Sequence, residues 1–70
     1  MNVWIINSNN DNFDSVVAFS LEDAHNYIRA SLPDNKLCSR TIQYKDGIKI
    51  KEHMSYYDAI IIDIRRAKVI

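Results

Sequence analysis

Two short segments of this sequence are apolar at every position, yet only one stretch of the chain has the pattern of a helix. The apolar segments are Val3–Ile6 and Ala59–Ile62. Uninterrupted apolar runs are typical of strands that are buried on both faces of a sheet. Because one helix covers only one face, we expect a loop, a second copy of the chain or a partner protein to cover the other. The pattern therefore favours a role in binding.

Size and composition indicate one small folded domain. All 70 residues fit a single domain, residues 1–70, and 47% apolar side chains are typical of a globular protein. A chain this short buries only about 60% of its unfolded surface, and self-association is a common way to gain stability. The one cysteine, Cys38, excludes a disulfide within the chain and fits a reducing compartment. The apolar stretch near Met1 is too short for a signal peptide and no apolar run reaches membrane-spanning length, so we expect neither kind of segment. We expect a cytoplasmic protein with no membrane contact.

The segment from Ser20 to about Leu32 predicts an amphipathic helix. Ser20 is a good N-cap residue, and Asp23 follows three residues later as in a capping box. Pro33 ends the helix, since it has no amide hydrogen and disfavours the helical conformation at the preceding residue. An apolar stripe at helical spacing marks the face that packs on the sheet, namely Leu21, Ala24, Ile28 and Leu32.

Strands are expected on both sides of this helix. The first two, at about Asn2–Asn7 and Ser15–Phe19, are separated by a polar turn. After the helix, a hairpin turns near Asp46-Gly47, and a short connection at Glu52–Ser55 leads to a last strand at about Tyr57–Ile64. Residues 65–70 either extend that strand or form a basic tail.

The hairpin at Asp46-Gly47 allows two registers. A two-residue loop pairs Lys45 with Ile48 and divides the apolar residues between the two faces of the hairpin. A three-residue loop, residues 45–47, collects them on one face and places Gly47 at the left-handed position that such a loop requires. The four apolar residues are Ile42, Tyr44, Ile48 and Ile50. We predict the three-residue loop, which leaves a small basic patch on the opposite face, formed by Thr41, Gln43, Lys49 and Lys51.

The order of elements is strand-strand-helix-strand-strand-strand. This order predicts an α+β fold, a mostly antiparallel sheet of four or five strands with one helix packed on one face.

Residues suited to metal binding or catalysis are few and widely spaced. His25, His53 and Cys38 do not form a paired ligand motif. We expect Cys38 to be a half-buried structural thiol, and the only glycine, Gly47, belongs to a turn and so supplies no phosphate-binding loop. We therefore expect no enzyme activity, no metal, no cofactor and no small-molecule ligand.

Nucleic-acid binding is the runner-up function. Its candidate residues form a basic hairpin and a C-terminal basic cluster, namely Arg40, Lys45, Lys49, Lys51 and Lys68. A basic sheet face can follow a phosphate backbone. Against this function, the net charge is zero and the sequence shows no helix-turn-helix, zinc-finger or RNA-binding aromatic motif.

Protein binding is the function that the sequence favours. Aromatic and arginine side chains dominate interface hot spots, and the candidate residues of that kind are Tyr56, Tyr57, Arg65 and Arg66. The acidic loop at Asp11–Asp14 could meet a basic partner. A homodimer is compatible with this function, because a symmetric dimer presents a doubled surface to a third protein.

A resemblance narrows this expectation. A strand ending in Ala18-Phe19 that runs directly into Ser20-Leu21-Glu22-Asp23-Ala24 resembles very small phage-encoded proteins of the anti-CRISPR type, in which a strand pair, one amphipathic helix and an antiparallel sheet form the whole chain. The resemblance is one of architecture and carries over no site residue. It implies a stoichiometric inhibitor in the host cytoplasm that acts by occluding a surface of a defence or nucleic-acid machine.

Overall fold

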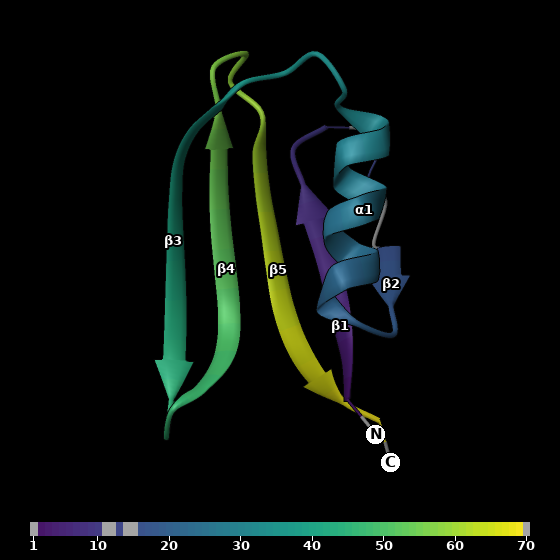
Figure 1. The fold of residues 1–70 in the computed structure, drawn as a ribbon, viewed down its shortest axis with the longest axis vertical. Coiled ribbons are helices and arrows are strands. Elements are labelled where there is room, and N and C mark those ends of the chain that lie inside the picture. Colours follow the sequence, from purple (N-terminus) through teal and green to yellow (C-terminus); the bar gives the residue numbers. More distant parts are fainter. Residues whose placement is uncertain (1, 11–12, 14–15, 70) are drawn as a thin grey trace.

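The computed structural model describes residues 2–10, 13 and 16–69 as a five-stranded sheet with one helix. The elements are β1 (Asn2–Ser8), β2 (Val16–Ala18), α1 (Leu21–Ser31), β3 (Leu37–Lys45), β4 (Ile48–Tyr56) and β5 (Ile61–Lys68). The strands lie in the order β2-β1-β5-β4-β3, and each neighbouring pair is antiparallel (Figure 1). The predicted α+β class is therefore confirmed.

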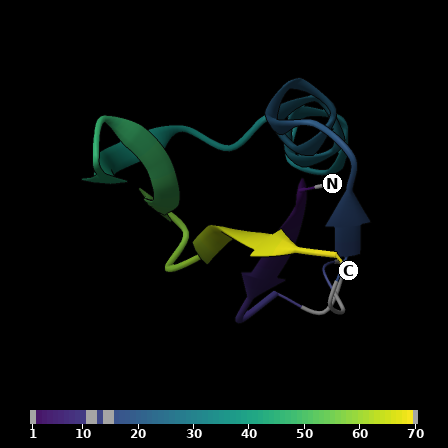
Figure 2. The same cartoon turned by 90° about the horizontal axis from the view of Figure 1, so that it is seen from below.

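The sheet is bent rather than flat. Viewed along the strands, α1 and the β3–β4 hairpin lie on the same side of the layer that β1 and β5 form (Figure 2). The helix covers β1 and β2, while the hairpin curls toward the helix from the other end of the sheet. We call the face that carries α1 the inner face and the opposite one the outer face.

The core lies between α1 and the inner face. Ile6, Ile62 and Ile64 are fully buried there, and burying one such side chain stabilises a fold by about 1.5–3 kcal/mol. The predicted helix is confirmed: the Ser20 side chain accepts a hydrogen bond from the Asp23 amide at 3.0 Å. Its apolar stripe packs as expected, with Ala24, Ile28 and Leu32 buried and Leu21 packed against the core.

The two apolar runs behave differently. Val3 and Ile6 of β1 are both buried although they point to opposite faces, so two-sided burial is confirmed for this run. The prediction is wrong for Ala59–Ile62. Ile62 is buried, but Ile61 is 40% exposed on the outer face and Ala59 is exposed in a turn before β5.

The predicted register of the β3–β4 hairpin is wrong. Lys45 pairs with Ile48 across a two-residue turn, because Asp46 and Gly47 both adopt positive φ, at 54° and 76°. The register shifts between Gln43 and Tyr44, where Ile50 is the extra residue of a β-bulge in β4. The bulge moves Lys49 out of the predicted basic patch and leaves Thr41, Gln43 and Lys51 on the outer face.

The predicted bounds of the last two strands are also wrong. The segment 52–55, predicted as a connection, belongs to β4, and the turn between β4 and β5 lies at residues 57–60. Ala59 takes a left-handed conformation there, with φ of 61°. The Asn9 side chain holds the turn by donating to the Ala59 carbonyl at 2.8 Å and accepting from the Ile61 amide at 2.9 Å. Arg65–Lys68 extends the last strand, which was one of the two alternatives for that segment.

Candidate binding cleft beside a buried glutamate

A glutamate stands among the core residues of the inner face. Glu52 in β4 pairs with Ile64 in β5, and its side chain has 0% exposure. A buried carboxylate without partners would be strongly destabilising. Its contacts therefore decide what this part of the molecule can do.

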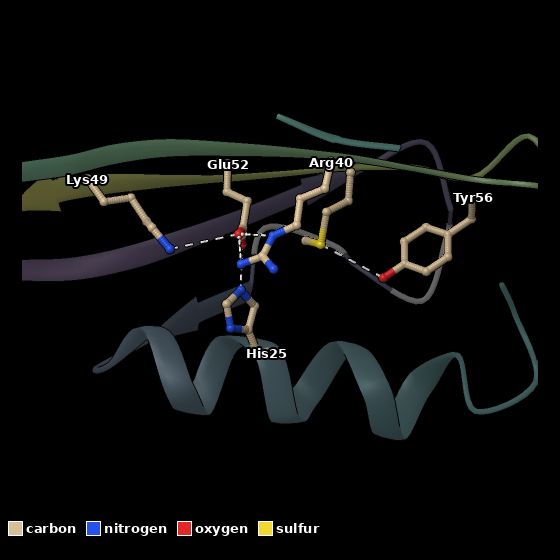
Figure 3. Close-up of polar contacts among 6 residues, drawn as sticks. His25, Arg40, Lys49, Glu52 and Tyr56 are labelled. Carbon is tan, nitrogen blue, oxygen red and sulfur yellow. Dashed lines mark hydrogen bonds and ion pairs between the residues drawn. The ribbon is translucent and has the colours of Figure 1, made fainter. Parts of the chain in front are cut away.

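Three basic side chains from three elements surround the Glu52 carboxylate (Figure 3). His25 of α1 donates from Nε2 to Oε2 at 2.5 Å, and Arg40 of β3 donates from Nε to Oε1 at 2.6 Å. Arg40 also contacts Oε1 through its terminal nitrogen, and the Nζ of Lys49 lies 3.9 Å from the same oxygen. The Glu52 carboxylate thus links α1 and the edge strand β3 to β4, the strand that carries Glu52.

The contacts keep Glu52 ionised. Burial acts to raise the pKa of Glu52, but the hydrogen bonds and positive charge of His25 and Arg40 outweigh it and hold that pKa below its ordinary value. Since an ionised carboxylate only accepts hydrogen bonds, the Nε2 of His25 carries a hydrogen. Burial and the nearby Glu52 charge raise the pKa of Tyr56, so its hydroxyl remains a donor at neutral pH.

A cleft of about 170 Å³ opens beside this carboxylate, between α1 and the β3–β4 hairpin. It is lined by His25, Ile28, Arg29, Leu37, Arg40, Met54 and Tyr56. The Tyr56 hydroxyl points into the space between helix and sheet, where its contact among the described residues is the Met54 sulfur at 3.9 Å. A thioether is a weak hydrogen-bond acceptor, so the Tyr56 hydroxyl is available to a stronger acceptor.

The cleft combines hydrogen-bond donors with apolar surface. Arg29, Arg40 and the Tyr56 hydroxyl supply donors, and Ile28, Leu37 and Met54 supply apolar surface. Glu52 is the acceptor, and His25 and Arg40 already occupy it. Among the described residues, no group of three or more histidine, cysteine, aspartate or glutamate side chains could hold a metal ion.

The candidate partner-binding residues do not form one surface. Tyr56 lines the cleft, and Tyr57 is 71% exposed in the following turn. Arg65 is exposed on the outer face beside Lys51, whereas Arg66 is half-buried on the inner face beside Trp4. Because adjacent strand residues point to opposite faces, Arg65 and Arg66 cannot serve the same surface patch.

The candidate nucleic-acid-binding residues are divided in the same way. Arg40 and Lys49 face Glu52, whereas Lys51 lies on the outer face. Lys45 lies at the hairpin turn and Lys68 at the far end of β5. The five residues therefore form no continuous basic face.

The other candidates are placed as follows. Cys38 is exposed, so the expectation of a half-buried thiol is wrong; it lies on the edge strand β3, where few side chains pack. His53 belongs to β4 and contacts Asp63 at 2.7 Å on the outer face. Asp11 and Asp14 of the acidic loop, and Ser15 at the start of the predicted second strand, lie outside the described residues.

Glu52 and the cleft were not predicted from the sequence. A signal was present, because Ile50, Met54 and Tyr56 alternate at strand spacing and Glu52 falls in the same phase. A charged residue in the apolar phase of a strand marks a candidate buried ion, but its partners on α1 and β3 lie 27 and 12 residues away. That pairing depends on the bend of the sheet, which the alternation pattern does not encode.

Comparison of the chain with family models, with curated proteins and with solved structures finds no match. Among the described residues, no helix is long and apolar enough to cross a membrane.

Proposed function

We propose that this chain is a non-enzymatic protein-binding module that captures an extended segment of a partner protein along the free edge of β3. The segment would add a sixth strand to the sheet next to β3. Inhibition of a host machine by occlusion, as the resemblance implies, is one use of such binding and stays a prediction.

The observation that carries this proposal is the length and exposure of the edge. β3 is nine residues long, and eight of its side chains are exposed, with Ile42 half-buried. Among the described residues its one neighbour in the sheet is β4, so alternate backbone N–H and C=O groups of β3 are free of strand pairing on the other side. Such an edge is a ready template for another strand, and strand addition is a recurring mode of peptide recognition.

The composition of β3 is that of an open edge. Natural proteins commonly protect long edge strands with proline, inward-facing charges or several lysines. β3 contains no proline, and its one lysine, Lys45, stands at the hairpin turn. Its inward-facing arginine, Arg40, is held by Glu52. A partner strand therefore meets little opposition between Ser39 and Gln43, the part of β3 that lies between its two register shifts.

A proline scan of β3 tests the proposal. Peptide ligands are first selected from a displayed library of random 12-residue sequences, and each of Thr41, Ile42 and Gln43 is then replaced by proline, so that Arg40 keeps its contacts with Glu52. Neighbouring amides alternate between β4 and solvent, so the variants that lose a bond to β4 are destabilised. Those that remain folded lose the solvent-facing donor, and we expect their peptide affinity to fall at least tenfold.

Two results would contradict the proposal. One is a folded proline variant that binds the selected peptides as tightly as the unmodified chain. The other is hydrogen exchange in which the bound peptide protects amides of β1 or β5 rather than those of β3. Peptide-free protection of β3 that rises with protein concentration would assign the edge to a second copy of the chain instead.

One observation favours a nucleic-acid function as a second candidate. Lys51 and Arg65 are cross-strand neighbours on the outer face, and neither has an ion-pair partner among the described residues. Like charges placed directly opposite each other cost stability, and phosphate groups would relieve that cost. Single-stranded DNA or RNA that binds with a steep loss of affinity in salt, and that releases on Lys51→Gln, would support this function.

A further inference from the structure

We propose that the cleft between α1 and the β3–β4 hairpin binds a carboxylate on a short apolar stem, the side chain of a glutamate in the captured segment. This inference rests on the proposed function, because it names which side chain of the partner strand the molecule selects. The cleft can be tested without that partner.

The charge of the cleft favours a carboxylate. Arg29 and Arg40 line the cleft, and Lys49 contacts the buried Glu52 carboxylate beside it. Among the described residues, no acidic side chain lines the cleft. Glu52 uses its two oxygens on His25, Arg40 and Lys49, so Arg29 is left without an acidic partner among the described residues; its contact is the Asn26 side-chain oxygen. A second carboxylate would therefore meet uncompensated positive charge.

The hydrogen-bond donors of the cleft also favour a carboxylate. A guanidinium has five N–H donors, and Arg40 directs two of its nitrogens at Glu52. Arg29 and Tyr56 line the same cavity and add a second guanidinium and a hydroxyl. Hydrogen bonds from charged donors to a carboxylate are roughly twice as strong as neutral ones. The cleft therefore favours an anionic oxygen over the neutral oxygen of an amide.

The size of the cleft limits what it can hold. Pockets that hold whole small molecules commonly measure about 300–1,000 Å³, whereas this cleft has about 170 Å³. It suits one side chain rather than a nucleotide or a cofactor. Ile28, Leu37 and Met54 offer apolar contact for the methylene groups of a glutamate stem.

The position of the cleft connects it with β3. Leu37 and Arg40 belong to β3 and also line the cleft. A strand added to the edge would place its inner-face side chains about 5 Å from those of β3, within reach of a cross-strand ion pair with Arg40. The cleft is thus partly built from the strand whose edge we propose as the capture site.

Butyrate and butyramide are the probes for the test. Butyrate reproduces a glutamate from Cα outward, and butyramide reproduces a glutamine, so the two differ only in charge and one hydrogen-bonding group. Each is titrated into the ¹⁵N-labelled chain at constant ionic strength and followed by NMR. We expect butyrate to saturate shifts at Tyr56 and Arg40 at millimolar concentration, and butyramide to bind at least tenfold more weakly.

Two variants and one control locate the site. Tyr56→Phe removes a hydroxyl donor, and Arg29→Gln removes a cation that does not touch Glu52, so neither disturbs the buried carboxylate. We expect each to weaken butyrate binding threefold to tenfold. Lys51→Gln removes the same charge as Arg29→Gln on the outer face and should leave butyrate binding unchanged.

The outcomes separate the cleft from the edge. Equal binding of butyrate and butyramide, or an equal loss in Lys51→Gln and Arg29→Gln, would overturn the carboxylate site. Butyrate binding that survives in a folded β3 proline variant, together with loss of the selected peptides, would support both proposals. If butyrate binds but the proline changes leave peptide affinity unchanged, the cleft is supported and the edge is rejected. If replacing glutamate by glutamine in the selected peptides leaves their affinity unchanged, the glutamate assignment is rejected.

Discussion

Glu52 is the residue on which the most structure depends. Its carboxylate receives hydrogen bonds from α1 and β3 while its backbone lies in β4, so one side chain fixes the distance between helix and hairpin. A buried ion with partners on separate elements contributes more to a defined geometry than to net stability, because desolvation offsets much of the attraction. Removing one partner is costly, since the remaining charges are left buried or unsatisfied.

Glu52→Gln should lower the free energy of unfolding by about 1–3 kcal/mol, because charged hydrogen bonds to His25 and Arg40 are replaced by neutral ones. Urea unfolding measures the change. The matched control is Asp63→Asn, which removes a carboxylate from a half-exposed pair with His53 and should cost less than about 1 kcal/mol. Equal losses of unfolding free energy in the two variants would show that the contacts of Glu52 contribute no more stability than a half-exposed ion pair.

Acid should weaken the fold through the same residue. The pKa of Glu52 is about 4.3 in an unfolded chain and lower in the folded one, so the unfolded state takes up the proton first as pH falls. The stabilisation is therefore complete above the unfolded pKa and is lost as pH falls below it toward the folded pKa. The difference in unfolding free energy between the unmodified chain and Glu52→Gln should shrink below about pH 4.3; a constant difference down to pH 3 would contradict the shifted pKa.

At the scale of elements, the helix was predictable from the sequence, whereas the turns that set the strand registers and bounds were not. The helix was predictable because Ser20, Pro33 and a one-sided apolar stripe are local signals that agree. The β3–β4 register was not, since Asp46 and Gly47 accept two loop lengths and the bulge at Ile50 reconciles the two-residue loop with the buried face. The start of β5 was missed because four apolar residues in a row give no sign that Ala59 turns.

Ala59 offers a direct test of the turn before β5. A left-handed alanine costs roughly 1–2 kcal/mol, and glycine removes this strain while gaining entropy in the unfolded chain. Ala59→Gly should therefore raise the free energy of unfolding by about 0.5–1 kcal/mol. Ala30→Gly, the same change at an exposed helical position, should lower it by about 0.5–1 kcal/mol. Thermal unfolding compares the pair, and destabilisation by both would show that Ala59 is unstrained.

At the scale of the whole molecule, the chain consists of a layered core and an attached hairpin. The core joins α1, β1, β2 and β5, and holds most of the buried side chains. The hairpin is attached through the pairing of β4 with β5 and, on the inner face, through Glu52 and Met54. The candidate cleft lies at this junction. Its parts are 12–27 residues apart in sequence, which is why local patterns predicted the layers but not the site.

Hydrogen exchange should reveal this division. Amides of β3 that bond to β4 should open at a free energy at least about 1 kcal/mol below those of β1 and β5, since β3 buries none of its side chains fully. Glu52→Gln should lower the opening free energy of β3 and β4 further and leave β1 nearly unchanged. Uniform exchange across the five strands would show that hairpin and core unfold as one unit.

The two edges of the sheet are unequal, and this has a consequence for solubility. β3 offers nine residues, whereas β2 at the opposite edge offers three. Growth of a fibre by repeated strand addition needs two adhesive ends on every molecule. Among its described residues this molecule has one long edge, β3, so a strand that pairs with β3 ends the growth of the fibre. A protein with one strand-binding edge can therefore remain at high concentration without forming fibres.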